Sequence, residues 1–304
     1  MFRSKESFIA LLMLVVVALP FVQAEAGEPG ESGFLSLRLP VGARETAMGG
    51  AGVASAAGAS TVFWNPALAA FEATGTDLLL QHQRWLGLFD KETLLVSHRN
   101  SLGNFGFIFS GIYSDDIGRY GEESVGIQEG SFNPYQVAIG LSYSRNITDA
   151  LSAGLTVKFL HEEIDVYGGS GFAFDFSLAH KAIVDGLWFG ASLTNIGSDI
   201  TLDTEPYRLP TALRIGFGYD VLGSMTVVGD VVVPNDGNEK AHVGAEYRIF
   251  SVFALRAGTK INYESQGFTA GAGFTRGQMI VGYAFEDMVN DLDPSHRFSI
   301  EMRY

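Results

Sequence analysis

Residue types that could bind metal ions or catalyse reactions are sparse in this chain and poorly spaced for either task. The sequence has six histidines and no cysteine, which excludes disulfides, zinc–thiolate sites and a cysteine nucleophile. No two histidines stand at the spacing of a metal-binding pair, and neither a serine nucleophile elbow nor a phosphate-binding loop is present. The cluster His161-Glu162-Glu163 is better interpreted as a solvated charged surface. The sequence therefore predicts no enzymatic activity, no metal site and no cofactor.

A second group of charged residues occupies alternate positions between apolar ones. Successive side chains of an extended strand point to opposite faces, so these charges share a face that is distinct from the one carrying Phe, Tyr, Leu and Val. Their two signs are interspersed, which suits ion pairing around an enclosed segment better than a filter for one type of ion. The alternative is that they line a wet lumen without partners. The group comprises Lys158, Asp175, Arg214, Asp230, Glu246 and Arg256, with Lys260, Glu286, Glu301 and Arg303 in the same setting.

The elements that would position these charges are β-strands. Apolar residues recur at every second position from residue 77 to the C-terminus, as where Phe172, Phe174 and Phe176 alternate with Ala173 and Asp175. About fourteen such segments follow one another, and most are near the roughly 9–11 residues with which a tilted strand crosses a bilayer. They lie near 77–86, 91–99, 103–113, 134–145, 150–163, 170–181, 185–195, 210–220, 224–234, 239–248, 251–262, 265–275, 277–287 and 295–304. The pattern predicts an all-β fold, a transmembrane antiparallel β-barrel over 77–304. A soluble β-sandwich or β-propeller is the alternative on composition alone.

The connections between these segments fall into two classes. Every second connection is short, whereas the alternate set includes 114–133 and 196–209. Short turns at one rim and longer loops at the other are typical of bacterial outer-membrane barrels, and an even number of strands places both termini at the short-turn, periplasmic rim. The last strand alternates over 298–304 and ends on Tyr304, which resembles the signal by which the barrel-assembly machinery recognises its clients.

The first residues indicate export from the cytoplasm. Arg3 and Lys5 precede an apolar run from Phe8 to Leu19, and small residues suited to cleavage follow. This pattern predicts a secretory signal peptide over 1–24, with cleavage after residue 24 or residue 26. An N-terminal membrane anchor is the alternative, but the run is shorter than the ~20 residues that a spanning helix needs.

The overall composition suits a protein embedded in lipid rather than one that binds nucleic acid. The formal net charge is −14 and there is no basic run, which argues against a nucleic-acid partner. The chain contains 37 glycines, 23 phenylalanines and 11 tyrosines, and only 18% of its residues are charged. High glycine with many aromatics and few charges is expected of a β-protein with one surface against lipid, here the lipid of a bacterial outer membrane.

Residues 27–76 depart from the strand pattern and are rich in small side chains. One motif runs from Gly42-Ala43-Arg44 into Ala47-Met48-Gly49-Gly50-Ala51, and a second reads Trp64-Asn65-Pro66-Ala67. Small residues permit tight backbone packing, and asparagine before proline favours a turn or a helix start. We therefore expect short helical turns in a compact segment.

These two motifs, with a barrel that closes on His296 to Ile300, resemble the PorV/PorQ family within the wider FadL-like group of outer-membrane barrels. The resemblance covers essentially the whole mature chain. It implies that residues 27–76 form a hatch, or plug, inside a barrel of fourteen strands. The hatch motif residues would be Gly42, Arg44, Met48, Gly49, Gly50, Asn65, Pro66 and Ala67.

The resemblance also implies function. FadL-like proteins admit hydrophobic molecules such as long-chain fatty acids, which implies passage of small hydrophobic molecules through this chain. PorV-like members resemble components of type IX secretion, which implies an accessory role with secreted proteins as partners as the alternative. A third hypothesis, an outer-membrane enzyme, would need a Ser/His or His/carboxylate cluster at the outer rim, and the sequence offers none that is convincing.

The third predicted strand contains three glycines, Gly103, Gly106 and Gly111. Glycine weakens strand pairing, so we expect this strand to be the place where the wall opens toward the bilayer. An unbroken hydrogen-bond ladder along 103–113 would argue against that hypothesis.

Overall fold

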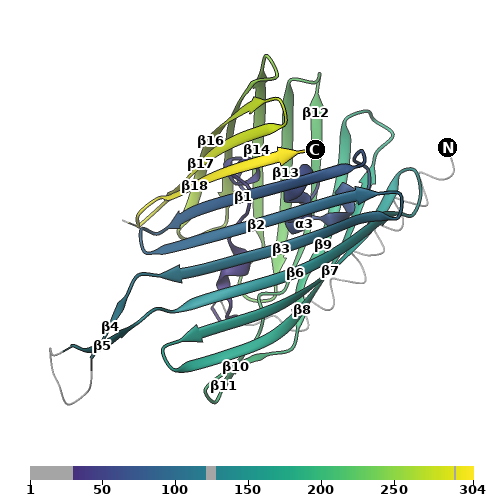
Figure 1. Cartoon of the computed structure of the whole chain (residues 1–304). Helices are drawn as coiled ribbons and strands as arrows, with labels where there is room; N and C mark the ends of the chain where they lie inside the picture. The colour runs from purple at the N-terminus through teal and green to yellow at the C-terminus, as the bar shows by residue number, and fades with distance from the viewer. Residues whose placement is uncertain (1–29, 121–127, 291) are drawn as a thin grey trace.

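The computed structural model describes residues 30–120, 128–290 and 292–304 (Figure 1). The predicted signal peptide, residues 1–24, lies outside the described residues, as does the start of the predicted hatch.

Within the described residues, fourteen strands pair antiparallel with their neighbours and close into a barrel in which the first strand meets the last (Figure 1). This arrangement confirms the predicted fold and strand number. Closure leaves no unpaired edge along the wall, which is what a sheet needs in order to span lipid. The strands are β1 (Gly75–Trp85), β2 (Phe89–Asn100), β3 (Gly103–Ser114), β6 (Tyr135–Asn146), β7 (Leu151–Ile164), β8 (Tyr167–Lys181), β9 (Leu187–Gly197), β12 (Ala212–Val221), β13 (Met225–Pro234), β14 (Lys240–Ile249), β15 (Phe253–Ile261), β16 (Gln266–Arg276), β17 (Met279–Met288) and β18 (Ser295–Arg303).

The two long connections hold two further hairpins that the alternation pattern did not predict. They are β4 (Ile117–Tyr120) with β5 (Gln128–Phe132), and β10 (Ile200–Leu202) with β11 (Glu205–Tyr207). Their strands are three to five residues long, too short for an alternation pattern to be recognised. Both hairpins project at the end of the barrel opposite the C-terminus (Figure 1).

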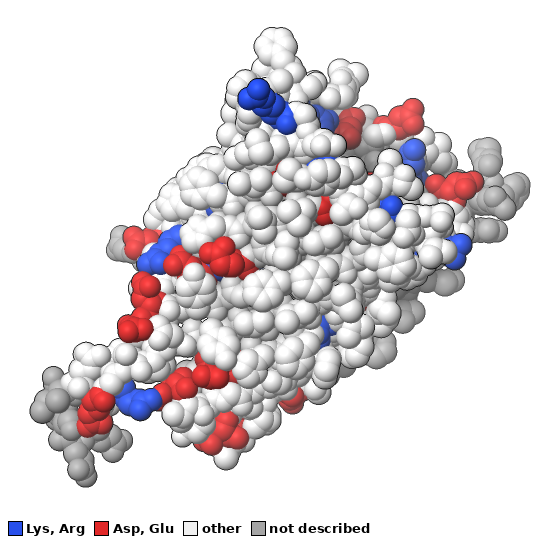
Figure 2. All heavy atoms as spheres, in the orientation of Figure 1, with Lys and Arg blue, Asp and Glu red and all other residues white. Residues whose placement is uncertain are grey.

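The outward-facing residues of the strands are apolar. In β8, Phe172, Phe174 and Phe176 are exposed, whereas Ala173 and Asp175 between them are buried. Exposed large apolar side chains continue around the wall, and the middle of the face seen in Figure 2 carries few charged residues. An apolar band of this kind is the surface that lipid requires.

Short turns and long connections are sorted between the two rims. The rim that carries the starts of β1 and β3 and the end of β18 has the short turns, such as residues 101–102 between β2 and β3. The opposite rim carries the two long connections with their hairpins. We call these the terminal rim and the loop rim.

The N-terminal segment, residues 30–74, lies inside the barrel as a chain of short turns (Figure 1). Its helices touch inward faces on opposite sides of the wall, because α2 contacts β15 to β18 whereas α4 contacts β6 to β8. None of the helices in the described part of the chain is long and apolar enough to cross a membrane. The helices are η1 (Leu35–Arg38), α2 (Ala43–Ala47), η2 (Gly58–Ser60), α3 (Thr61–Trp64) and α4 (Pro66–Ala69).

Candidate functional site

The glycine-rich motif of the N-terminal segment packs backbone to backbone against the barrel wall. Gly49 has φ +77°, a left-handed conformation, and a Cβ at this position would stand 2.8 Å from the carbonyl oxygens of Val243 and Thr259. The facing wall residues, Gly244 on β14 and Gly258 on β15, likewise leave no space for a Cβ beside Met48 and Gly49. A turn can approach a strand this closely only where both surfaces lack side chains.

Hydrogen bonds fix the same motif at its two ends. Gly42 N donates to Gln81 Oε1 (2.6 Å), and Gly49 N donates to the Thr269 hydroxyl (2.9 Å), which itself donates to Ala47 O (2.9 Å). The imidazole of His242 lies between Gly50 O (3.0 Å from Nδ1) and the hydroxyl of Tyr263 (2.8 Å from Nε2). Hydrogen bonds from the inward faces of three strands, β1, β14 and β16, therefore hold this motif in place.

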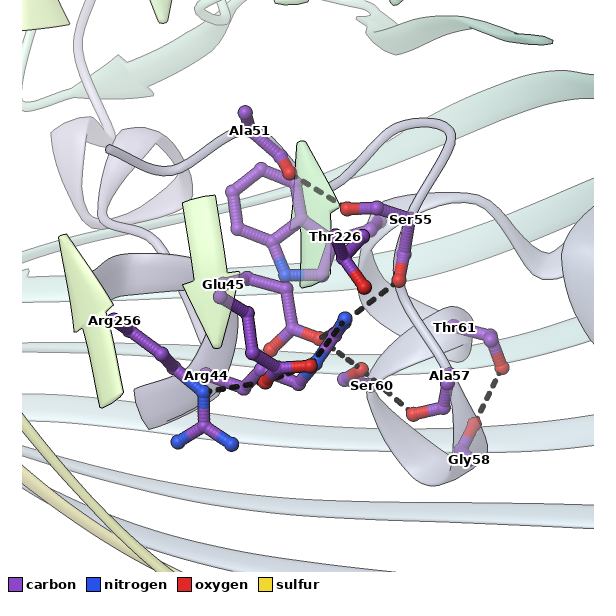
Figure 3. A network of polar contacts seen from close by, with 12 residues as sticks. Arg44, Glu45, Ala51, Ser55, Ala57, Gly58, Ser60, Thr61, Thr226 and Arg256 are labelled. Atoms are coloured by element: carbon purple, nitrogen blue, oxygen red, sulfur yellow. Dashed lines mark hydrogen bonds and ion pairs between the residues drawn. The ribbon is translucent and has the colours of Figure 1, made fainter. Parts of the chain in front are cut away.

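Arg44 is the centre of a polar cluster that joins the N-terminal segment to the wall (Figure 3). Its Nε donates to Glu246 Oε2 (3.1 Å), which also accepts from Arg256 Nε (2.7 Å), and its Nη1 donates to Ser55 O (2.7 Å). Burial alone would lower the pKa of the Arg44 guanidinium, but the charges of Glu246 and Glu45 outweigh burial and raise that pKa above its usual value. Arg44 is therefore held in its charged form between the segment and the wall.

The second motif forms a capped turn that is anchored to the opposite wall. The Asn65 side chain accepts from Ala67 N (3.1 Å) at the start of α4, with Pro66 in the first turn as the sequence predicts. Its amide nitrogen donates to Val53 O (2.7 Å) and to Leu178 O on β8 (2.9 Å). Ser144 and Ser152 donate to the carbonyls of Pro66 and Ala67, each at 2.6 Å.

The structure places the predicted lumen charges on inward faces and gives most of them partners. Lys158 pairs with Asp175 (2.7 Å), and Asp230 accepts from Val53 N of the N-terminal segment (3.1 Å). The guanidinium of Arg214 lies 5.2 Å from the centre of the Trp64 indole ring. Further pairs on the same faces are Lys260 with Glu286, Arg297 with Glu286 and Arg303 with Glu301. The charges thus act largely in pairs around the enclosed segment.

The N-terminal segment stands between cavities that open toward the two rims. The cavity on the loop-rim side, which we call the outer cavity, has a volume of about 570 Å³, and its lining includes Trp64, Trp85 and Tyr263. Two cavities on the terminal-rim side measure about 240 and 290 Å³, and Arg44 lines both. The outer cavity lies within the roughly 300–1,000 Å³ that ligand pockets span.

The predicted wall opening at Gly103, Gly106 and Gly111 is wrong. β3 pairs without a register break with β2 along its whole length and with β6 over residues 104–113. Gly106 instead lets the N-terminal segment approach, because a Cβ there would stand 2.7 Å from a methyl group of Val62. Glycine keeps its backbone hydrogen-bonding groups, so a lack of side chain alone does not open a ladder. Within the described barrel, the register shifts lie between β8 and β9 and between β16 and β17.

The residues that line the outer cavity were only partly identified from sequence. Arg214 was singled out as a lumen charge, but Lys240, Tyr263 and Trp85 were not. Tyr263 follows a strand end in a connection with no motif of its own. Its relation to His242 and Arg214 arises only when β12 to β15 lie side by side in the barrel wall. The one feature of the sequence that could have indicated Tyr263 as a cavity residue is its position, as an aromatic residue directly after a predicted strand.

No protein-family model and no curated protein matches this chain. Among solved structures, it is similar to the toluene transporter TodX of Pseudomonas putida, with 14% sequence identity, a TM-score of 0.66, and coverage of 87% of this chain and 96% of that one. It is similar to the monoaromatic hydrocarbon channel CymD, with 13% identity, a TM-score of 0.59 and the same coverage. A FadL homologue from Pseudomonas aeruginosa has 10% identity and a TM-score of 0.55, with coverage of 81% of this chain and 94% of that one. The chain therefore has the FadL-like barrel fold.

Proposed function

We propose that this protein is an outer-membrane channel through which small hydrophobic molecules pass. The observation that carries the proposal is the outer cavity of about 570 Å³, lined by Trp64 and Trp85, at one end of a lipid-facing barrel. Apolar and aromatic linings of this size suit compact hydrophobic ligands. The similar structures TodX and CymD are described as a toluene transporter and a monoaromatic hydrocarbon channel, which agrees with this class of substrate.

We further propose the topology that such a role requires. Residues 1–24 would direct export, the terminal rim would face the periplasm, and the strand 298–304 would be read by the barrel-assembly machinery. The short turns at that rim and the position of the C-terminal end of β18 there support this orientation. Residues 27–76 would then act as a hatch between the outer cavity and the periplasm, with the motif residues described above holding it in the barrel.

Uptake by whole cells tests the proposal, because the outer leaflet of an outer membrane is the barrier that such a channel would bypass. Cells that lack their own hydrophobic channel are compared with and without this chain for accumulation of labelled toluene and labelled octanoate. We expect faster uptake of at least one apolar ligand, and no change for a sugar of similar size. A matched variant, Ala212→Trp, fills the outer cavity and should reduce the gain. Equal uptake with and without the chain for every apolar ligand would contradict the proposal.

An accessory role in type IX secretion is the alternative, which the PorV-like motifs at 42–51 and 64–67 favour. This role makes a different prediction, namely that the chain co-purifies with a secretion complex from its native membrane. Co-purification without any effect on apolar uptake would favour the accessory role.

A further inference from the structure

The short turns of the terminal rim carry large apolar side chains at their tips. Every turn at this rim except residues 277–278 has such a side chain, and the exposed fraction reaches 96% for Leu222 and 91% for Phe250. Turns in water usually consist of Gly, Pro, Asn, Asp or Ser. A repeated pattern of exposed apolar side chains, unlike a single one, marks an interaction surface. These residues, which we call the turn tips, are Leu102, Ile147, Ile183, Val184, Leu222 and Phe250.

Two of the turn tips have a backbone conformation that does not suit their side chains. Leu222 and Phe250 both have φ 52°, and the residues after them, Gly223 and Ser251, also have positive φ. Tight hairpin turns of this geometry favour asparagine, aspartate and glycine, because other side chains are strained in the left-handed region. A bulky apolar residue at a strained and exposed position indicates that its side chain makes a favourable contact outside the chain.

The turn tips continue the lipid-facing surface of the wall. Tyr247 and Phe253, on the outward faces of β14 and β15, are exposed on either side of the turn that carries Phe250. Met225, the first residue of β13, is likewise exposed beside Leu222. The apolar surface therefore runs from the wall on to the turns of the terminal rim.

At the loop rim the outward faces are polar instead. His161 of β7 shares a hydrogen bond with Ser170 of β8 (2.9 Å), and Glu163 lies one outward position farther toward that rim. The exposed apolar positions of these strands begin two residues nearer the terminal rim, at Phe159 and Phe172. Figure 2 also shows acidic residues at the loop-rim end of this face. The apolar band is therefore displaced toward the terminal rim.

A lipid leaflet fits this arrangement better than a protein partner does. The turn tips are spread around the rim from the β2–β3 turn to the β14–β15 turn. A compact protein would reach all of them only by covering the end of the barrel, whereas a leaflet surrounds the barrel on every side. Arg145 and Arg276 are exposed near the same rim, where their guanidinium groups can reach lipid phosphates while their stems lie along apolar surface.

We propose that the terminal rim is immersed in the lipid leaflet next to it, with the turn tips among the acyl chains and Arg145 and Arg276 at the phosphate groups. The partner of this surface is therefore phospholipid. This inference concerns how the barrel sits in the membrane, and it goes beyond the proposed function because it holds whether or not apolar molecules pass through the barrel.

Spin labelling of the purified full-length mature protein in vesicles of phosphatidylethanolamine and phosphatidylglycerol tests the inference. One nitroxide is attached to Leu222→Cys or Phe250→Cys, which the absence of native cysteine allows. Electron paramagnetic resonance then compares collisions with oxygen, which concentrates in lipid, and with a water-soluble nickel chelate. We expect oxygen collisions to exceed nickel collisions at both positions, as they should at the wall reference Leu141→Cys.

Val166→Cys is the matched control at the opposite rim. Val166 is an apolar turn residue that is 72% exposed, but it follows Asp165, which pairs with Arg119. A label at this position should collide more with the nickel chelate than with oxygen. Heat-modifiable migration in gels verifies that each labelled variant is folded.

A second measurement asks whether lipid contact at the turn tips stabilises the barrel. The double variant Leu222→Asn with Phe250→Asn keeps the turn geometry, because asparagine tolerates positive φ. Its urea midpoint should fall below that of the wild type in dimyristoyl phosphatidylcholine and should match or exceed it in the thinner didecanoyl lipid, where less acyl chain reaches the tips. Val166→Asn should shift neither midpoint.

The outcomes decide between lipid and other partners. Nickel-dominated collisions at both turn positions, as at Val166, would overturn the inference and would leave a periplasmic protein as the partner of the turn tips. A double variant as stable as the wild type in the thicker bilayer would also overturn it. Neither result bears on the uptake of apolar molecules, so failure of this inference is distinct from failure of the proposed function.

Discussion

Asn65 concentrates three hydrogen bonds in one fully buried side chain. Two of them join parts of the N-terminal segment, to Ala67 N and Val53 O, and the third reaches Leu178 O in the wall. Asn65→Ala leaves these groups unpaired, and we expect local destabilisation of about 1–3 kcal/mol. Hydrogen–deuterium exchange over residues 61–70 should accelerate accordingly. The matched control is Asn146→Ala, at an exposed asparagine, which should leave exchange unchanged; identical profiles for both variants would contradict this role.

Glu246 pairs with three cations, Arg44, Arg256 and, at 3.8 Å, Arg248. Because several cations share one carboxylate, we expect its substitution to cost more than substitution of one cation. Glu246→Gln removes the carboxylate partner of Arg256 and leaves Arg44 with Glu45 alone (3.6 Å), and breaking such a buried group costs about 3–5 kcal/mol. Arg44→Met should be milder, because Glu246 keeps Arg256 at 2.7 Å. Urea unfolding in lipid vesicles measures both midpoints. Equal shifts for the two variants would show that the cluster does not act as described.

The contact between Arg38 and Asp236 should depend on pH. Burial would raise the pKa of the Asp236 carboxyl, but hydrogen bonds from Arg38 and Ser32 outweigh burial and hold that pKa below its usual value. The contact therefore contributes its full stabilisation of the folded state above the unfolded pKa of about 4. This stabilisation is lost as the pH falls through the lowered pKa of the folded state. Hydrogen exchange at residues 30–40, corrected for intrinsic rates, should rise only below pH ~4. Asp236→Asn should abolish this step, and a step that persists in the variant would assign it to another group.

At the scale of elements, each strand has one face against lipid and one against the N-terminal segment. Leu141, near the middle of β6, is 66% exposed on the outward face, whereas Ser142 beside it is buried. Leu141→Arg should therefore destabilise the barrel by about 2–4 kcal/mol in vesicles, the cost of an arginine at the bilayer midplane. Leu141→Met is the apolar control and should unfold close to the wild type. An arginine variant as stable as this control would mean that β6 does not face lipid at this level.

The inward faces of the strands carry small residues where the N-terminal segment touches the wall and charged residues between these contacts. Gly244 and Gly258 meet the turn at Met48 and Gly49, and Gly282 on β17 meets Ala43. Small residues on the strands and in the segment therefore match position by position, so that backbone atoms pack directly. Charged residues such as Asp230 and Glu246 fill the positions between these contacts and bond to the segment.

At the scale of the whole molecule, the N-terminal segment separates the outer cavity from the cavities at the terminal rim. A molecule that crosses the barrel along its axis can do so only if this segment moves. The chain has no cysteine, so a disulfide between Ala43→Cys and Gly282→Cys can be introduced without side reactions. A Cβ at Gly282 would lie 3.0 Å from Ala43 Cβ, which is shorter than the roughly 3.5–4.5 Å between the Cβ atoms of a disulfide, so the segment and β17 must move apart slightly when the bond forms.

We expect the oxidised double variant to block apolar uptake and reduction to restore it. Each single-cysteine variant is a control and should transport in both redox states. Undiminished uptake by the fully oxidised variant would mean that passage does not require movement of the segment at this point, and would direct attention to the register shift between β8 and β9.

The sequence by itself determined the strands, their number and the sorting of loops. These features are local, because a strand between lipid and a packed interior must alternate apolar and small or polar residues, as Phe172 to Phe176 do. The turn at Asn65 and Pro66 was likewise predictable, because its capping group and helix start lie within two residues of each other.

Only the tertiary structure decided which residues meet across the lumen. Arg44 and Glu246 are 202 positions apart, and nothing in either neighbourhood marks them as partners until the barrel closes around the segment. For the same reason, the expectation that the three glycines of β3 open the wall was wrong. Gly106 leaves space for Val62 of the N-terminal segment, and the ladder between β2 and β3 is unbroken. The outer cavity arises from strands and loops that share no sequence pattern and become neighbours only through closure.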